Sequence, residues 1–149
     1  MSYRVILYTR TTYDIYYVYI SYMATKYIKP LYDIGLTAIV MLLLDIVFLY
    51  ANSDMFVKQV IAVQRTNLQI KYLGAAACYV FLVLGLYYFI IREGRPVWDA
   101  FVLGLVIYGV YEWTNYSIIK KWRVQTVIQD TLWGGVLFAA TTWVVYNVR

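Results

Sequence analysis

Long apolar segments alternate with short charged ones along this chain. Four of them are about as long as a helix that crosses a bilayer, which needs roughly 20 residues. They are residues 34–53, 72–91, 100–119 and 131–148. Two contain no charge, and the other two are each interrupted by one carboxyl group, Asp45 in the first and Glu112 in the third. The pattern predicts four membrane-spanning helices.

The first 30 residues differ from the rest because they are rich in tyrosine and carry Arg10 and Asp14. Tyrosine prefers the headgroup level to the bilayer centre. Residues 11–25 therefore have two interpretations: an imperfect fifth span or helix packed at the membrane, or a helix that reaches a partner protein. Pro30 is expected to end this helix. We predict an all-α fold, with a tyrosine-rich helical extension, 1–30, and a four-span transmembrane helical bundle, 31–149.

Composition supports a membrane protein, with 63% hydrophobic and 14% charged residues. The connection that contains residues 56–63 is expected to hold a short helix in the membrane interface. Because the net charge of +5 lies in short clusters between apolar segments, we expect lipid headgroups as the partner and not nucleic acid. The connection formed by Lys120, Lys121, Trp122 and Arg123 is predicted to contact headgroups or partner proteins. One cysteine and no histidine argue against metal and redox chemistry, so we expect no cofactor.

Polar residues inside the spans form the candidate site. A charge at mid-bilayer is costly and usually faces other helices or a wet cavity. Glu112 and Asn115 lie on one helical face, and Asp130 is expected to begin the last span, where a carboxylate complements the helix amino terminus. The predicted intramembrane cluster is Asp45, Glu112, Asn115, Asp130 and Trp133. The glycines predicted to allow close helix packing are Gly104, Gly134 and Gly135.

Three interpretations of this cluster compete. The first, which we favour, is a hydrogen-bonded clamp that joins three helices and needs no cation, because a protonated carboxyl donates as well as accepts. The second is a proton or cation relay. Catalysis by the carboxyl pair of Asp45 and Glu112 is the least favoured, because no nucleophile, metal set or phosphate loop accompanies it.

Three segments give the chain a family resemblance. LDIVFL at 44–49, GLVIYGVYEWTN at 104–115 and DTLWG at 130–134 resemble motifs of the DUF2177 family of small four-span membrane proteins. The resemblance covers residues 34–148. It departs at Glu112, where the family usually has aspartate, and at Phe48, where tryptophan is frequent. The resemblance implies the four-span fold but no activity, and residues 1–30 lie outside it.

These observations lead to a functional expectation. We expect a non-catalytic multi-pass integral membrane protein with a structural role in a larger membrane-associated assembly, and not an enzyme. Because the family includes relatives in large DNA viruses, we expect that assembly to be the internal membrane and minor capsid layer of such a particle, with capsid proteins as partners. The alternative is a small proton- or cation-coupled transporter or channel that uses the buried acids.

Overall fold

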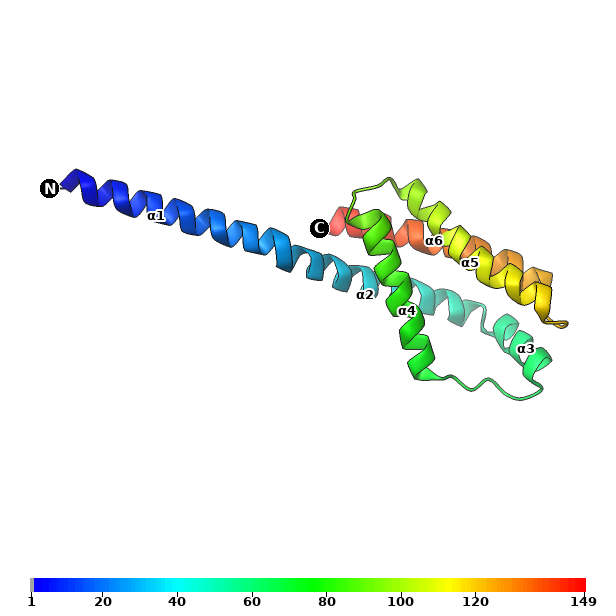
Figure 1. Ribbon diagram of the computed structural model, residues 1–149. Coiled ribbons are helices and arrows are strands. Elements are labelled where there is room, and N and C mark those ends of the chain that lie inside the picture. Colours follow the sequence, from blue (N-terminus) through cyan, green and yellow to red (C-terminus); the bar gives the residue numbers. More distant parts are fainter. Residues whose placement is uncertain (1) are drawn as a thin grey trace. The chain divides into compact units, whose positions relative to one another are not determined.

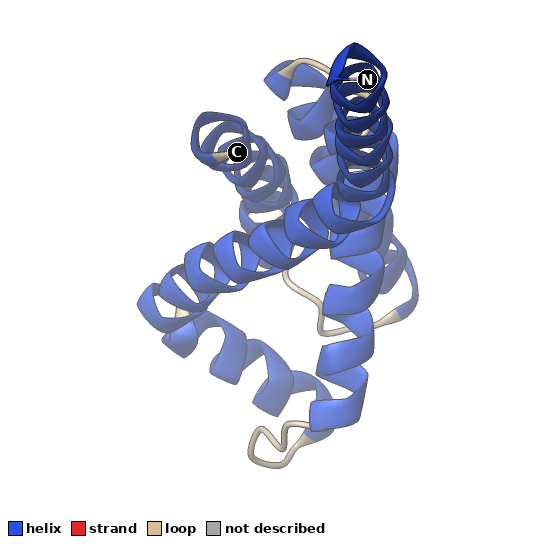
Figure 2. Ribbon diagram, turned by 90° about the vertical axis from the view of Figure 1, so that its left-hand side faces the viewer, coloured by secondary structure: helices blue, strands red, loops and turns tan. Residues whose placement is uncertain are grey.

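The fold is entirely helical in a computed structural model that describes the backbone of residues 2–149 and the side chains of residues 13–23 and 25–149. Within that described part, no strand occurs and the helices are joined by short loops (Figure 2). The chain divides into two units, Met1–Asp33 and Ile34–Arg149. The expected all-α class is confirmed.

The first unit is a helix. It comprises α1, Ser2–Met23, a π-helical turn, Ala24–Ile28, and the beginning of α2, Lys29–Ala51. The expectation that Pro30 ends the helix is wrong, because α2 continues through it. The π-helical turn Ala24–Ile28 directly precedes Pro30, and such a turn changes the local hydrogen-bond pattern at the point where the proline lacks an N–H group.

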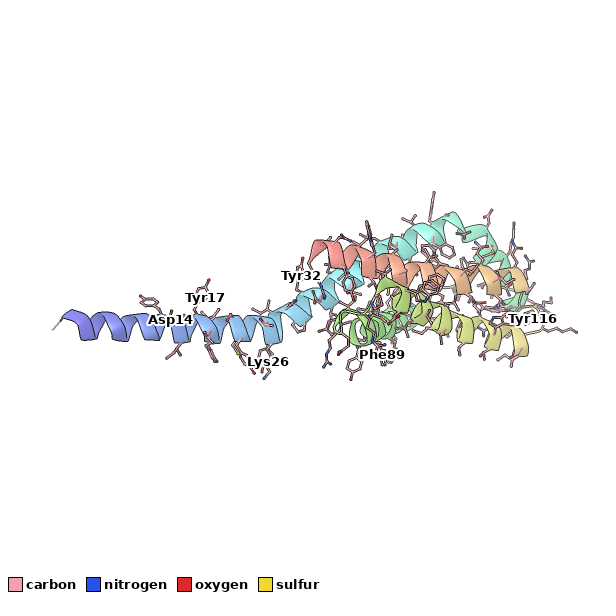
Figure 3. All side chains as sticks on the ribbon, turned by 90° about the horizontal axis from the view of Figure 1, so that it is seen from above. Asp14, Tyr17, Lys26, Tyr32, Phe89 and Tyr116 are labelled. Carbon is pink, nitrogen blue, oxygen red and sulfur yellow. The ribbon has the colours of Figure 1, made fainter. Side chains whose placement is uncertain are left out.

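The side chains of this helix are exposed. Every described side chain from Tyr13 to Met23 is exposed, and Tyr17, which projects from the helix in Figure 3, reaches 80%. Lys26 Nζ lies 3.1 Å from the hydroxyl of Tyr22, so these two polar groups bond to each other within the helix. The side chains of Arg4 and Arg10 lie outside the described residues.

The second unit is a bundle. Besides the rest of α2 it contains α3, Ser53–Gln64; α4, Tyr72–Leu86, with a π-helical end, Tyr87–Ile91; α5, Val97–Ile118; and α6, Val124–Val148. Helices α5 and α6 run side by side over most of their length (Figure 1) and form the most extensive helix pair. The core consists of apolar side chains from α2, α4, α5 and α6. Its fully buried members include Met41, Leu86, Ala100, Leu137 and Phe138.

Hydropathy distinguishes the long helices from one another. Two continuous helical stretches in the described chain are long and apolar enough to cross a membrane, Tyr13–Ala51 and Tyr72–Ile91. Helices α5 and α6 have 22 and 25 residues, which is sufficient length for a span, but they are not among the stretches that meet this hydropathy level. The number of four spans therefore stays a prediction.

Candidate functional site

Asp45 joins three helices through one carboxylate. It is 7% exposed and lies on the same inward face of α2 as the buried Met41 and Thr37, four and eight residues earlier. The hydroxyl of Tyr79 on α4 donates to Asp45 Oδ2 over 2.5 Å, and the indole Nε1–H of Trp133 on α6 donates to Asp45 Oδ1 over 2.7 Å. Each carboxylate oxygen therefore has a neutral donor from a different helix. We call these three residues the Asp45 clamp.

Trp133 contacts α2 a second time. Its ring stacks on Phe48, with the ring centroids 4.2 Å apart and the planes at 6°. Asp45 and Phe48 are three residues apart, so they lie on neighbouring positions of one helical face. One indole thus contacts α2 through both its N–H group and its ring face, which fixes the rotation of α6 against α2.

Glu112 belongs to a second set of contacts, centred on α5 and the start of α6. It is 2% exposed, and the indole Nε1–H of Trp122 donates to its Oε2 over 2.7 Å. The carboxyl group of Asp130 on α6 lies close to that of Glu112. Two neighbouring carboxyl groups can share one proton, because the electrostatic repulsion between two carboxylates disfavours the ionisation of both.

Asp130 occupies a different part of its helix from the one expected. The helix α6 begins at Val124, so Asp130 lies well inside it and does not complement its amino terminus. The expectation of a helix-terminal carboxylate is wrong, because the polar segment that precedes the apolar one is itself helical. This position brings Asp130 to Glu112. Asn115 lies three residues further along α5 and is half-buried.

A cavity connects the two sets of contacts. Its volume is about 340 Å³, and its lining includes Asp45, Asp130, Tyr108, Tyr111 and Cys78. The remaining lining is aliphatic or aromatic, so the polar groups face one partly open pocket lined by α2, α3, α4, α5 and α6. Within the described residues, no group of three or more histidine, cysteine or acidic side chains is arranged to hold a metal ion.

The glycines lie where α5 and α6 approach most closely. A β-carbon added at Gly104 would collide with the backbone carbonyl of Gly134, and one added at Gly134 would collide with the ring of Tyr108. A β-carbon at Gly135 would lie 2.8 Å from the ring of Phe101. Because there is no space for a side chain at any of the three, glycine sets the distance between these helices.

Sequence reasoning did not identify Gln59, which fixes α3 to the turn between α5 and α6. Gln59 is 2% exposed. Its side-chain N–H donates to the carbonyl of Lys121 over 3.1 Å, and its Oε1 accepts from the backbone N–H of Arg123 over 3.2 Å and, at 3.4 Å, from the hydroxyl of Thr126. The available signal was a polar residue on the apolar face of an amphipathic helix.

The basic connection is the turn between α5 and α6. Lys120, Lys121 and Arg123 are exposed, whereas Trp122 is half-buried and its indole N–H donates to Glu112.

Tyr79 was absent from the predicted cluster. Its signal was a hydroxyl in the middle of an uncharged span, where a buried tyrosine needs a hydrogen-bond partner.

A helical bundle with carboxyl groups buried among apolar helices, and with large apolar side chains exposed on its outside, defines a helical membrane protein. The chain belongs to the DUF2177 family of predicted membrane proteins, whose family model matches residues 31–147. No curated protein and no solved structure matches the chain.

Proposed function

We propose that this chain is a non-catalytic, multi-pass membrane protein that acts as a structural component of a larger membrane-associated assembly. The observation that carries the proposal is the Asp45 clamp. A carboxylate that accepts from a tyrosine and a tryptophan on two other helices already has partners for both oxygens. Such a group stabilises a shape and needs no substrate, because interhelical polar contacts of this kind fix helix register in membranes.

The extension 1–30 is the proposed contact to neighbouring proteins. The chain leaves the side chains of Tyr13–Met23 exposed, and a continuous exposed surface of this kind is normally covered by lipid or protein. Tyrosine is enriched at the centre of protein interfaces. The proposed assembly is the internal membrane and minor capsid layer of a large DNA virus particle, and this part of the proposal depends on the family's viral relatives alone.

The test is native mass spectrometry after gentle detergent extraction from the natural source. The proposal expects the chain to remain in a multi-protein particle at fixed stoichiometry. A variant that lacks residues 2–23 should lose the partners while the remaining bundle stays folded, as judged by its thermal melting. Recovery of the full chain as a lone monomer or small homo-oligomer would contradict the structural role.

A second candidate is a small proton- or cation-coupled transporter. The cavity beside Asp130, together with the neighbouring carboxyl groups of Glu112 and Asp130, favours it. This candidate expects a pH-dependent flux in proteoliposomes that Glu112→Gln abolishes while the variant melts at the parent temperature. An unchanged flux in that folded variant would eliminate it.

A further inference from the structure

Three basic side chains line one cavity at the end of the bundle where α3 lies beside the α5–α6 turn (Figure 1). The cavity has a volume of about 370 Å³, and Arg65, Lys120 and Lys121 contribute to its lining. Aliphatic side chains form most of the remainder, among them Val63, Ile118 and Ile119. No acidic residue contributes to it. The space therefore combines concentrated positive charge with an apolar wall.

Hydrogen bonds hold the two walls of this cavity in place. Gln59 bonds to the carbonyl of Lys121 and the N–H of Arg123, which fixes the turn against α3. At the other wall, Arg65 ends α3 in the left-handed conformation, with φ of 56°, and its N–H bonds to the carbonyl of Ile61. This conformation is uncommon for a residue other than glycine. The backbone that carries all three cations is therefore held in a defined geometry.

Among the described side chains, these cations have no carboxylate partner, in contrast to those at the opposite end of the bundle. There, Arg92 lies 3.4 Å from Glu93, and Arg95 lies 3.9 Å from Asp99. Over residues 13–149, no ion pair joins Arg65, Lys120 or Lys121 to an acidic side chain. Three neighbouring like charges repel one another unless an anion lies between them.

We propose that this cavity binds the phosphate-bearing headgroup of an anionic phospholipid. Arg65, Lys120 and Lys121 contact the phosphate, and Val63 and Ile118 contact the first part of an acyl chain. Arginine and lysine are the side chains that bind phosphate oxygens most strongly, and the apolar wall distinguishes a lipid from a free anion. The site holds a specific lipid against the α3 end of the bundle.

The test compares two variants of equal net charge. Lys120→Gln with Lys121→Gln removes two cations of the site, whereas Arg92→Gln with Arg95→Gln removes two from the opposite end. Neither variant alters the backbone carbonyl of Lys121 that Gln59 uses. The full chain, purified in detergent, is titrated with phosphatidylglycerol and with phosphatidylcholine, and bound lipid is counted by native mass spectrometry.

The expected result has three parts. Phosphatidylglycerol binds more tightly than phosphatidylcholine, the lysine variant loses about 25-fold of this affinity at roughly 5-fold per charge, and the arginine variant keeps it. Equal binding of the two lipids, or an equal loss in both variants, overturns the proposal. Displacement of the lipid by inorganic phosphate at equal concentration also overturns it, because the site would then be one for a free anion.

Discussion

Replacing the carboxylate of the Asp45 clamp should loosen two helices from α2 at once. In Asp45→Leu, the hydroxyl of Tyr79 and the indole N–H of Trp133 both lose their acceptor. Interhelical hydrogen bonds in membranes contribute about 0.6 to 2 kcal/mol each. Two such bonds give an expected loss of roughly 1 to 4 kcal/mol in the free energy of unfolding, and Tyr79→Phe alone should cost about half of that.

A double-mutant cycle isolates the bond between Asp45 and Tyr79. Tyr79→Phe should cost about 0.6 to 2 kcal/mol in the parent chain and almost nothing in Asp45→Leu, because the acceptor is already absent. The measurement is unfolding in mixed micelles of a mild detergent and dodecyl sulfate, followed by tryptophan fluorescence. The matched control is Tyr72→Phe, on the same helix but 81% exposed, which should change the stability by less than about 0.5 kcal/mol.

Additive effects of Asp45→Leu and Tyr79→Phe would refute this reasoning. Additivity would mean that the two side chains stabilise the bundle independently, so the 2.5 Å contact would carry no coupling energy. An equal cost for Tyr79→Phe and Tyr72→Phe would have the same meaning, because only Tyr79 bonds across helices.

Three further substitutions test the other contacts. Gly104→Ala should lower the free energy of unfolding by about 1 to 3 kcal/mol through overpacking, because the added β-carbon would collide with the backbone of Gly134. The control Gly85→Ala has open space around it and should change the stability by less than about 1 kcal/mol. Equal melting temperatures of the two variants would contradict this prediction. Glu112→Gln keeps an acceptor for Trp122 and should melt near the parent, whereas Glu112→Leu should melt lower; a leucine variant as stable as the parent would disprove the contact. Gln59→Leu leaves three groups without their partner and should speed proteolysis at the α5–α6 turn, and an unchanged cleavage rate would show that Gln59 does not hold it.

Helices were predictable from the sequence because their apolar segments are long and their charges lie at the ends. Segment 72–91 matches the helical stretch Tyr72–Ile91 residue for residue, since Lys71 and Arg92 flank it without interruption. The short helix expected around residues 56–63 is present as α3, Ser53–Gln64, whereas its place in the membrane interface stays a prediction. Both predictions used only hydropathy and spacing, which report burial in an apolar environment.

Hydrogen-bond partners could not be predicted in the same way. Hydropathy indicates which residues lie in an apolar environment, but it does not indicate where a helix begins. The polar segment before residue 131 therefore gave no indication that α6 begins at Val124. For that reason Asp130 was assigned to a helix terminus, although it lies inside α6 and close to Glu112. The choice of Tyr79 as a partner of Asp45 depends on the rotation of α4 against α2, which no local pattern along either helix specifies.

Asp45 and the neighbouring acids Glu112 and Asp130 test different aspects of the proposed function. Asp45 has a neutral donor on each oxygen, so its replacement should reduce stability whether the chain is structural or transports ions. Glu112 and Asp130 lie close to each other, and Asp130 also faces the cavity, so they are the groups that a moving proton would use. Because Glu112→Gln preserves the shape and hydrogen bonding of the side chain but cannot carry that proton, it separates the two functions, and a variant of Asp45 cannot.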